Sequence, residues 1–148
     1  MRSTFVNGSL IGLLLMAGCR KEDAIPDPAP SIEVVSIMPA TAQQYSDAVT
    51  VRTRYRDNNG DLGENTAGVK NCFAVDNRIG IRYEYRISQL APSGSAVPIE
   101  GEVDINLGGQ GILDSLASEE RVTFTVTVVD RAGNSSNPVT TPEVRIIR

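Results

Sequence analysis

The stretch VTVRTRYRD, residues 49–57, decides the fold class, because apolar or aromatic residues alternate with polar ones through most of it. Successive side chains of a β-strand point to opposite faces of a sheet, so the pattern predicts a strand with one buried face and one arginine-rich face. The segment IGIRYEYRIS, residues 79–88, repeats the alternation and is the longest such pattern in the chain. Both segments favour antiparallel sheets with one solvated face.

Further strand patterns lie on both sides of these two segments. Pro39 ends the strand predicted at residues 32–37. Gly101, within the strand predicted at residues 97–107, is expected to mark a bulge or a close approach of another segment. Residues 113–120 have room for one short helical turn. Strands at this spacing, without an amphipathic helix, predict a single all-β domain of six to seven strands in two packed antiparallel sheets. The further patterns cover residues 32–37, 97–107, 122–128 and 144–146, with a short extra strand at Phe73 and Val75.

The composition limits the function. The 148 residues suit one domain, and 14 basic against 18 acidic residues leave a net charge of −4. Arg52, Arg54 and Arg56 are expected on a solvated strand face, so nucleic acid is not an expected partner. The chain has no histidine, which excludes Ser–His–Asp and Cys–His catalysis and every histidine-containing zinc site. It has no tryptophan, which weakens a sugar-platform interpretation.

The first 19 residues, MRSTFVNGSLIGLLLMAGC, have the layout of an export signal. Arg2 supplies a positive start, and the apolar segment 10–16 is too short to span a bilayer. The end of the segment, Met16-Ala17-Gly18-Cys19, resembles the bacterial lipobox, in which the cysteine is lipidated and becomes the first residue after cleavage. The resemblance implies a lipoprotein signal peptide at residues 1–18 and a lipid anchor on Cys19. An ordinary secretory signal with a chance cysteine is the alternative.

Residues 19–30 are predicted to tether the domain to this anchor. Lys21-Glu22-Asp23 resembles the surface-export signal of Bacteroidota lipoproteins, which implies an outer-membrane protein facing the cell exterior; the periplasmic face is the alternative. Pro26, Pro28 and Pro30 favour an extended polyproline II chain. The β-sandwich domain is then residues 31–148.

We interpret three residues within the strand patterns as packing residues: Cys72, Tyr83 and Tyr85. With Cys19 acylated, Cys72 has no partner for an intramolecular disulfide and is expected to be buried and unreactive. Tyr83 and Tyr85 share the parity of Ile81, which places them in the core or at its rim. An exposed tyrosine pair for sugar stacking is the alternative.

Two loops that follow predicted strands carry the residues with the most chemistry. The first, DNNGDLGE at residues 57–64, has oxygen side chains at positions one, three and five, a spacing that resembles a calcium loop. It is not an EF-hand, because Leu62 stands where that loop needs glycine. The second, DRAGNSSN at residues 130–137, resembles the Asp-x-Ala-Gly-Asn turn of bacterial immunoglobulin-like and fibronectin-like domains, with positive φ expected at Gly133 or Asn134.

These two loops are expected to lie together at one end of the sandwich. Two interpretations remain open: a shared calcium ion, which would be the one cofactor, or Asx-turn hydrogen bonds that need no metal. In the calcium interpretation the side-chain ligands are Asp57, Asn59, Asp61 and Asp130.

The lipobox and the two loops together resemble small Bacteroidota surface lipoproteins with an Asp-x-x-Gly-Asp-Leu-Gly loop early and an Asp-Arg-Ala-Gly-Asn loop late. Here these are residues 57–63 and 130–137. The resemblance implies an immunoglobulin-like or fibronectin-like sandwich, and it bears on fold and location more than on function.

Three functions are compared. The first is a non-catalytic binding or adhesion module with a protein or polysaccharide ligand. The second is a structural or assembly component of the cell envelope. The third, a glycosidase-type enzyme, has only Asp57 with Asp61, or Glu119 with Glu120, as close carboxylate pairs. Adjacent glutamates on a strand point to opposite faces, and the turn lacks a second domain to form a pocket, so no enzyme is expected.

Overall fold

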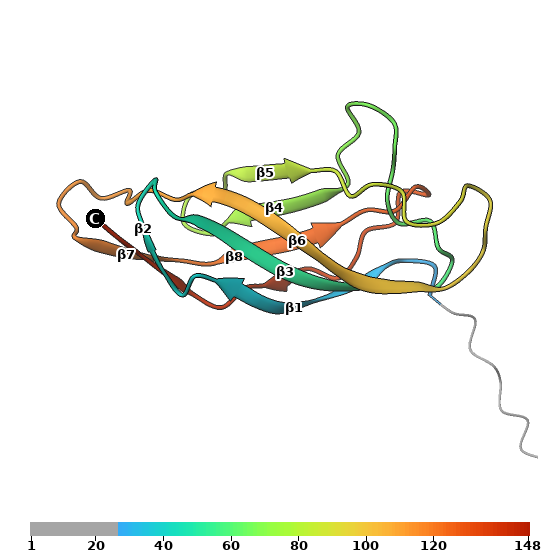
Figure 1. Ribbon diagram of the computed structural model, residues 1–148, viewed down its shortest axis with the longest axis horizontal. Coiled ribbons are helices and arrows are strands. Elements are labelled where there is room, and N and C mark those ends of the chain that lie inside the picture. The colour runs from blue at the N-terminus through green and yellow to red at the C-terminus, as the bar shows by residue number, and fades with distance from the viewer. Residues whose placement is uncertain (1–26) are drawn as a thin grey trace, which may run out of the picture.

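The computed structural model describes residues 27–148, which form ten β-strands and no helix (Figure 1). The predicted signal peptide, Cys19 and most of the tether lie outside the described residues. No helix that could cross a membrane occurs within residues 27–148. The strands are β1 (Ser31–Met38), β2 (Thr41–Gln43), β3 (Ala48–Asp57), β4 (Cys72–Asp76), β5 (Arg82–Tyr85), β6 (Ile99–Gly109), β7 (Glu119–Val122), β8 (Phe124–Val128), β9 (Val139–Thr140) and β10 (Val144–Ile147).

Two main sheets form the sandwich. One has the order β1-β3-β6 and the other β5-β4-β8-β9, and every pairing within them is antiparallel. A small sheet, β2-β10-β7, includes one parallel pairing, between β2 and β10. Only Thr123 separates β7 from β8, and short breaks separate β1 from β2 and β9 from β10, so each of these pairs is one interrupted strand. Counted in this way, the fold is the predicted all-β sandwich, with seven strands.

Strand β3 confirms the alternation that predicted it. Its three arginines are exposed, and two of them pair with acidic residues of β6: Arg52 with Asp104 at 2.8 Å and Arg54 with Glu102 at 2.9 Å. Such exposed pairs add little stability, so they mark a solvated face. The side chains on the other face of β3 are buried: Val49, Val51, Thr53, Tyr55 and Asp57.

Several residues singled out in the sequence pack in or against the core between the two sheets. Phe124 is fully buried, and the ring of Tyr83 packs edge-on against it with 6.3 Å between the ring centroids. Tyr83 and Tyr85 are half-buried against the core, as predicted. Cys72 is buried, and burial raises the pKa of its thiol to about 12, which agrees with an unreactive cysteine. A Cβ on Gly101 would lie 2.5 Å from the Tyr55 hydroxyl, so this glycine permits the predicted close approach.

The bounds of two predicted strands differ in the structure. The strand predicted at residues 79–88 is shortened to β5, and Ile79 and Ile81 are exposed. The backbone N–H groups of Ile79 and Gly80 both donate to the carbonyl of Asp76, so a tight turn occupies the start of the alternating pattern. The strand predicted at 97–107 begins only at Ile99. Residues 113–120 hold one turn, which the N–H of Ala117 closes on the carbonyl of Asp114 at 3.1 Å, and β7 begins at Glu119.

Candidate functional site

The two oxygen-rich loops lie together at one end of the sandwich, which confirms that part of the prediction. The backbone N–H of Arg131 donates to the carbonyl of Asp61 at 3.1 Å, and its Nη1 donates to the carbonyl of Gly63 at 2.8 Å. The described chain also enters at this end, where Asn58 Nδ2 donates to the carbonyl of Asp27 at 3.2 Å (Figure 1). The guanidinium of Arg131 therefore fastens the second loop to the first beside the chain entry.

The first loop is anchored through Asp57 and Leu62. Asp57 ends β3 as a fully buried carboxylate, and its Oδ2 accepts the N–H of Leu62 at 2.7 Å while Oδ1 accepts the N–H of Asn59 at 3.3 Å. Leu62 is itself fully buried and belongs to the hydrophobic core. The leucine that argued against an EF-hand is thus the residue that holds this loop on the sandwich.

Two glycines let the first loop turn this tightly. Gly63 has a φ of 92°, and a Cβ on it would lie 2.3 Å from the carbonyl oxygen of Ser88. Gly60, with a φ of 72°, meets the carbonyl oxygen of Val97 in the same way. Both positions therefore require glycine for conformation and for space.

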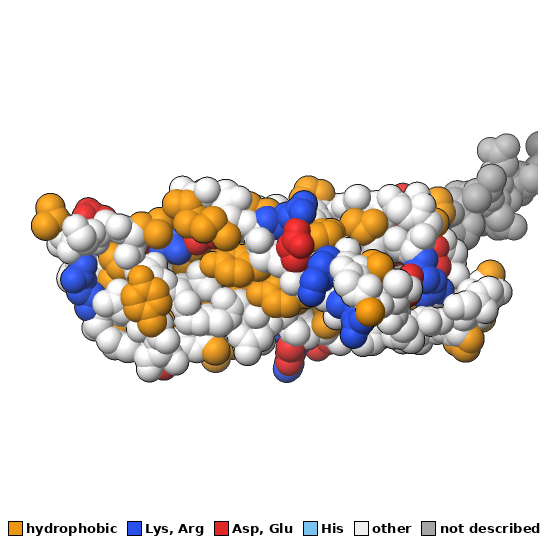
Figure 2. Space-filling model, turned by 90° about the horizontal axis from the view of Figure 1, so that it is seen from above, with side chains coloured by type: hydrophobic (Ala, Val, Ile, Leu, Met, Phe, Trp, Pro, Cys, Tyr) orange, Lys and Arg blue, Asp and Glu red, His pale blue; other side chains and the backbone are white. Residues whose placement is uncertain are grey.

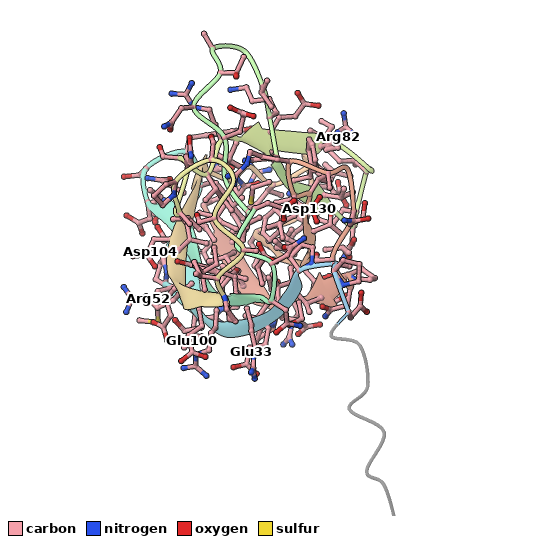
Figure 3. The ribbon with its side chains drawn as sticks, turned by 90° about the vertical axis from the view of Figure 1, so that its right-hand side faces the viewer. Glu33, Arg52, Arg82, Glu100, Asp104 and Asp130 are labelled. Carbon is pink, nitrogen blue, oxygen red and sulfur yellow. The ribbon has the colours of Figure 1, made fainter. Side chains whose placement is uncertain are left out.

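The second loop is closed by Asp130. Its Oδ1 accepts the backbone N–H of Asn134 and its Oδ2 accepts Asn134 Nδ2, both at 2.8 Å. Gly133 has the positive φ, 89°, that was predicted for this position or for Asn134. Asn137 then clamps β1, since its side chain accepts the N–H of Ile32 and donates to the carbonyl of Ile32, each at 2.9 Å. In Figure 3, which looks onto this end, Asp130 lies inside the outline of the domain, whereas Arg52 and Asp104 lie at its rim.

The four predicted calcium ligands divide into two kinds. Asp57 and Asp130 have hydrogen-bond partners on both carboxylate oxygens. The Oδ1 atoms of Asn59 and Asp61 are buried and accept no hydrogen bond. Burial raises the pKa of Asp61 and the charges of Asp130 and Asp57 raise it further, whereas Arg131 and a backbone hydrogen bond from Ala132 lower it. The Asx-turn interpretation therefore accounts for Asp57 and Asp130 and leaves Oδ1 of Asn59 and Oδ1 of Asp61 without a hydrogen bond.

Sequence reasoning missed Arg131. The signal was its position directly after Asp130, which places a cation inside the acidic cluster, but the sequence does not show where its side chain goes. Within residues 27–148, no three acidic or thiol side chains stand close enough together to form a ready-made metal cage. Any cation here must therefore take some of its ligands from amide oxygens, backbone carbonyls or water.

The other carboxylate pair weighed for catalysis is engaged elsewhere. Glu119 pairs with Arg145 at 3.4 Å on the surface. Glu120 pairs with Arg78 at 2.9 Å, and its Oε1 accepts the N–H groups of Leu113 and Asp114. These partners lower the pKa of Glu120, with the two backbone hydrogen bonds as the largest cause. The two glutamates thus serve separate ion pairs.

Several exposed apolar side chains lie at the opposite end of the sandwich. Leu116 is 93% exposed, Tyr45 73% and Leu113 49%; we call these three residues the distal tip. Their segments adjoin, because the N–H of Tyr45 donates to the carbonyl of Gln110 and a Cβ on Gly111 would touch the Tyr45 ring. Figure 2 shows hydrophobic side chains at this end and along the rest of the visible face.

No family model, no curated protein and no solved structure matches this chain.

Proposed function

We propose that this protein is a lipid-anchored, non-catalytic binding or adhesion module of the outer membrane that faces the cell exterior. In this proposal Cys19 carries the lipid, the proline-rich segment is the tether, and a protein or polysaccharide ligand is bound away from the membrane.

The observation that carries the proposal is the position of the distal tip. The described chain enters at the loop end, and the tip lies at the other end of an elongated sandwich (Figure 1). A domain held from the loop end presents the tip farthest from its attachment. Exposed apolar side chains that gather in one place are typical of interaction sites. The apolar and aromatic character of Leu113, Leu116 and Tyr45 favours a protein ligand over a polysaccharide.

The experiment compares tip variants with a matched surface control. The full chain carrying Tyr45→Ser, Leu113→Ser and Leu116→Ser is displayed on cells beside the wild type and beside a control with Val69→Ser and Val97→Ser, two exposed apolar residues at the loop end. We expect binding to glycan and protein arrays, or cell adhesion, to be lost in the tip variant and retained in the control. Binding that survives in the tip variant contradicts the proposal. Capture of envelope proteins alone would favour the structural or assembly role.

Anchoring has its own test. Mass spectrometry of membrane-extracted protein should find an acylated Cys19 at the N-terminus, and Cys19→Ser should release the protein from the membrane fraction. A mature chain that begins elsewhere without a lipid contradicts this part of the proposal.

A further inference from the structure

The outer edge of β6 has no neighbouring strand within residues 27–148. β6 is the longest strand, with 11 residues, and it pairs only with β3. From residue 99 to residue 106, no backbone hydrogen bond within the described chain leads from β6 to a segment other than β3. Successive residues of a strand direct their N–H and C=O groups to opposite sides, so every second residue of this stretch presents unpaired backbone groups outward. We call residues 99–106 the free edge.

The other three edges of the two main sheets have features that limit the addition of a strand. β5 has four residues and β9 has two. β1 changes register between Val34 and Ser36, and Asn137 bonds both backbone groups of Ile32. Short edge strands, bulges and covering loops are common protections of a sheet edge. The irregularity of β6 lies beyond Asn106, and the free edge contains neither proline nor lysine. It is therefore the long, regular edge of the sandwich.

The core side of the free edge is incompletely covered. Thr53 and Asp57 of β3 are 0% exposed, whereas Val103 and Ile99, which pair with them on β6, are only partly buried. Paired residues lie on the same face of a sheet, so the apolar residues here are more exposed than their polar neighbours because no strand lies beside β6. An added strand would cover Ile99 and Val103 with apolar side chains of its own.

The side chains on the outer face of the free edge decide which strand fits. Glu100, Glu102 and Asp104 are exposed and form one acidic row, and Figure 3 shows Glu100 and Asp104 at the outline of the domain. Glu102 and Asp104 already pair with arginines of β3, and Glu100 has no ion pair within the described chain. A second copy of β6 would set carboxylate against carboxylate, and like charges in opposite positions are unfavourable. The row therefore favours a strand with basic side chains.

We propose that the free edge of β6 binds an extended segment of a protein partner that carries lysine or arginine at every second position and apolar residues between them. The segment extends the sheet β1-β3-β6 by one strand. Its backbone hydrogen bonds supply affinity, and its alternating side chains supply specificity. β3 already has this pattern on the other side of β6, with Arg52, Arg54 and Arg56 paired in register with Asp104, Glu102 and Glu100. This surface is separate from the distal tip, and the inference does not depend on the proposed function.

The experiment measures the binding of a peptide to the full chain in a non-ionic detergent. The probe is a fluorescently labelled peptide of alternating lysine and valine, with the length of the free edge. Its matched control is a peptide of alternating glutamate and valine. Fluorescence anisotropy measures the affinity, and amide hydrogen exchange followed by mass spectrometry locates the bound peptide.

Two charge reversals are compared with the wild type. Glu100→Lys changes the free edge without breaking an ion pair of the described chain. Glu84→Lys makes the same change at an exposed glutamate of β5, the edge strand of the other main sheet. The exposed pair of Glu84 with Arg82 contributes little to stability. Because both variants have the same net charge, a difference between them reports the position of the peptide.

We expect saturable binding of the lysine–valine peptide, weakened by added salt, and no binding of the glutamate–valine peptide. Hydrogen exchange should become slower in residues 99–106 and stay unchanged in β5. Glu100→Lys should weaken binding at least about twofold, the effect of one cross-strand charge pair, whereas Glu84→Lys should leave it unchanged.

Four results would overturn the inference. The first is no saturable binding up to about 1 mM peptide, and the second is equal binding of the two peptides. The third is slower exchange in β5 or at the distal tip in place of residues 99–106. The fourth is slower exchange in residues 99–106 on raising the protein concentration without peptide, which would assign the edge to a second copy of the chain. If Glu100→Lys does not fold, Glu100→Gln replaces it and should also weaken binding. None of these results affects the tests of the distal tip and the lipid anchor.

Discussion

Replacing Leu62 by alanine should destabilise the sandwich as strongly as a change in the centre of its core. Leu62 lies in the loop between β3 and β4, yet none of its surface is exposed. The substitution removes three carbon atoms, which at about 0.8 kcal/mol each amounts to roughly 2.4 kcal/mol of transfer free energy. The cavity left behind raises the expected loss of unfolding free energy to about 3–4 kcal/mol. For a domain of this size, the melting midpoint should fall by roughly 10–15 °C.

Urea unfolding of the full chain, followed by circular dichroism, measures this loss. The matched control is Leu116→Ala, the same chemical change at a side chain that is 93% exposed, which should alter the unfolding free energy by at most about 0.5 kcal/mol. The dependence of the unfolding free energy on urea should stay constant, because the folded state remains compact. A loss below about 1 kcal/mol for Leu62→Ala would falsify the assignment of this loop to the core.

Three further predictions concern stability and reactivity. Gly63→Ala should cost more than Gly94→Ala, because both glycines have positive φ but only the Gly63 Cβ would strike a backbone carbonyl; equal losses of unfolding free energy would contradict the clash. Cys72, with its pKa raised to about 12 by burial, should react with a thiol reagent at neutral pH only after unfolding, and rapid labelling of the folded protein would show an accessible thiol. Arg78→Met should cost about 3 kcal/mol, because it leaves the Asp76 carboxylate, 1% exposed, without its cation. Adding Asp76→Asn should restore part of that loss, and a double variant as unstable as the single one would refute this explanation.

The candidate site was only partly predictable. The spacing of Asp57, Asn59 and Asp61 identified the first loop, and the turn after Asp130 identified the second. Their contact follows from the topology, because β3 and β8 carry both loops to one end. The division into bonded and unbonded oxygens was not predictable, since it depends on which N–H groups each carboxylate reaches. Arg131 was missed for the same reason: a sequence records an arginine, and not the carbonyls that it reaches.

Local alternation determined the fold class by itself. In residues 49–57 the side chains change face at every residue, and the buried and exposed faces of β3 follow that order. In residues 79–88 the same pattern predicted too long a strand. The N–H of Gly80 donates to the carbonyl of Asp76, and this bond forms a turn across the first residues of the pattern. Alternation reports a preference of the chain, whereas backbone hydrogen bonds between distant segments decide where a strand begins.

The amino-acid sequence alone therefore determined the all-β class, the main strands, the buried cysteine and the loops worth examining. Each of these follows from neighbours in the chain, through side-chain parity and turn chemistry. Only the tertiary structure decided that Leu62 is a core residue, that Arg131 joins the two loops, and that the distal tip lies opposite the chain entry. These depend on the packing of segments far apart in sequence, since burial and hydrogen-bond partners are properties of the folded chain.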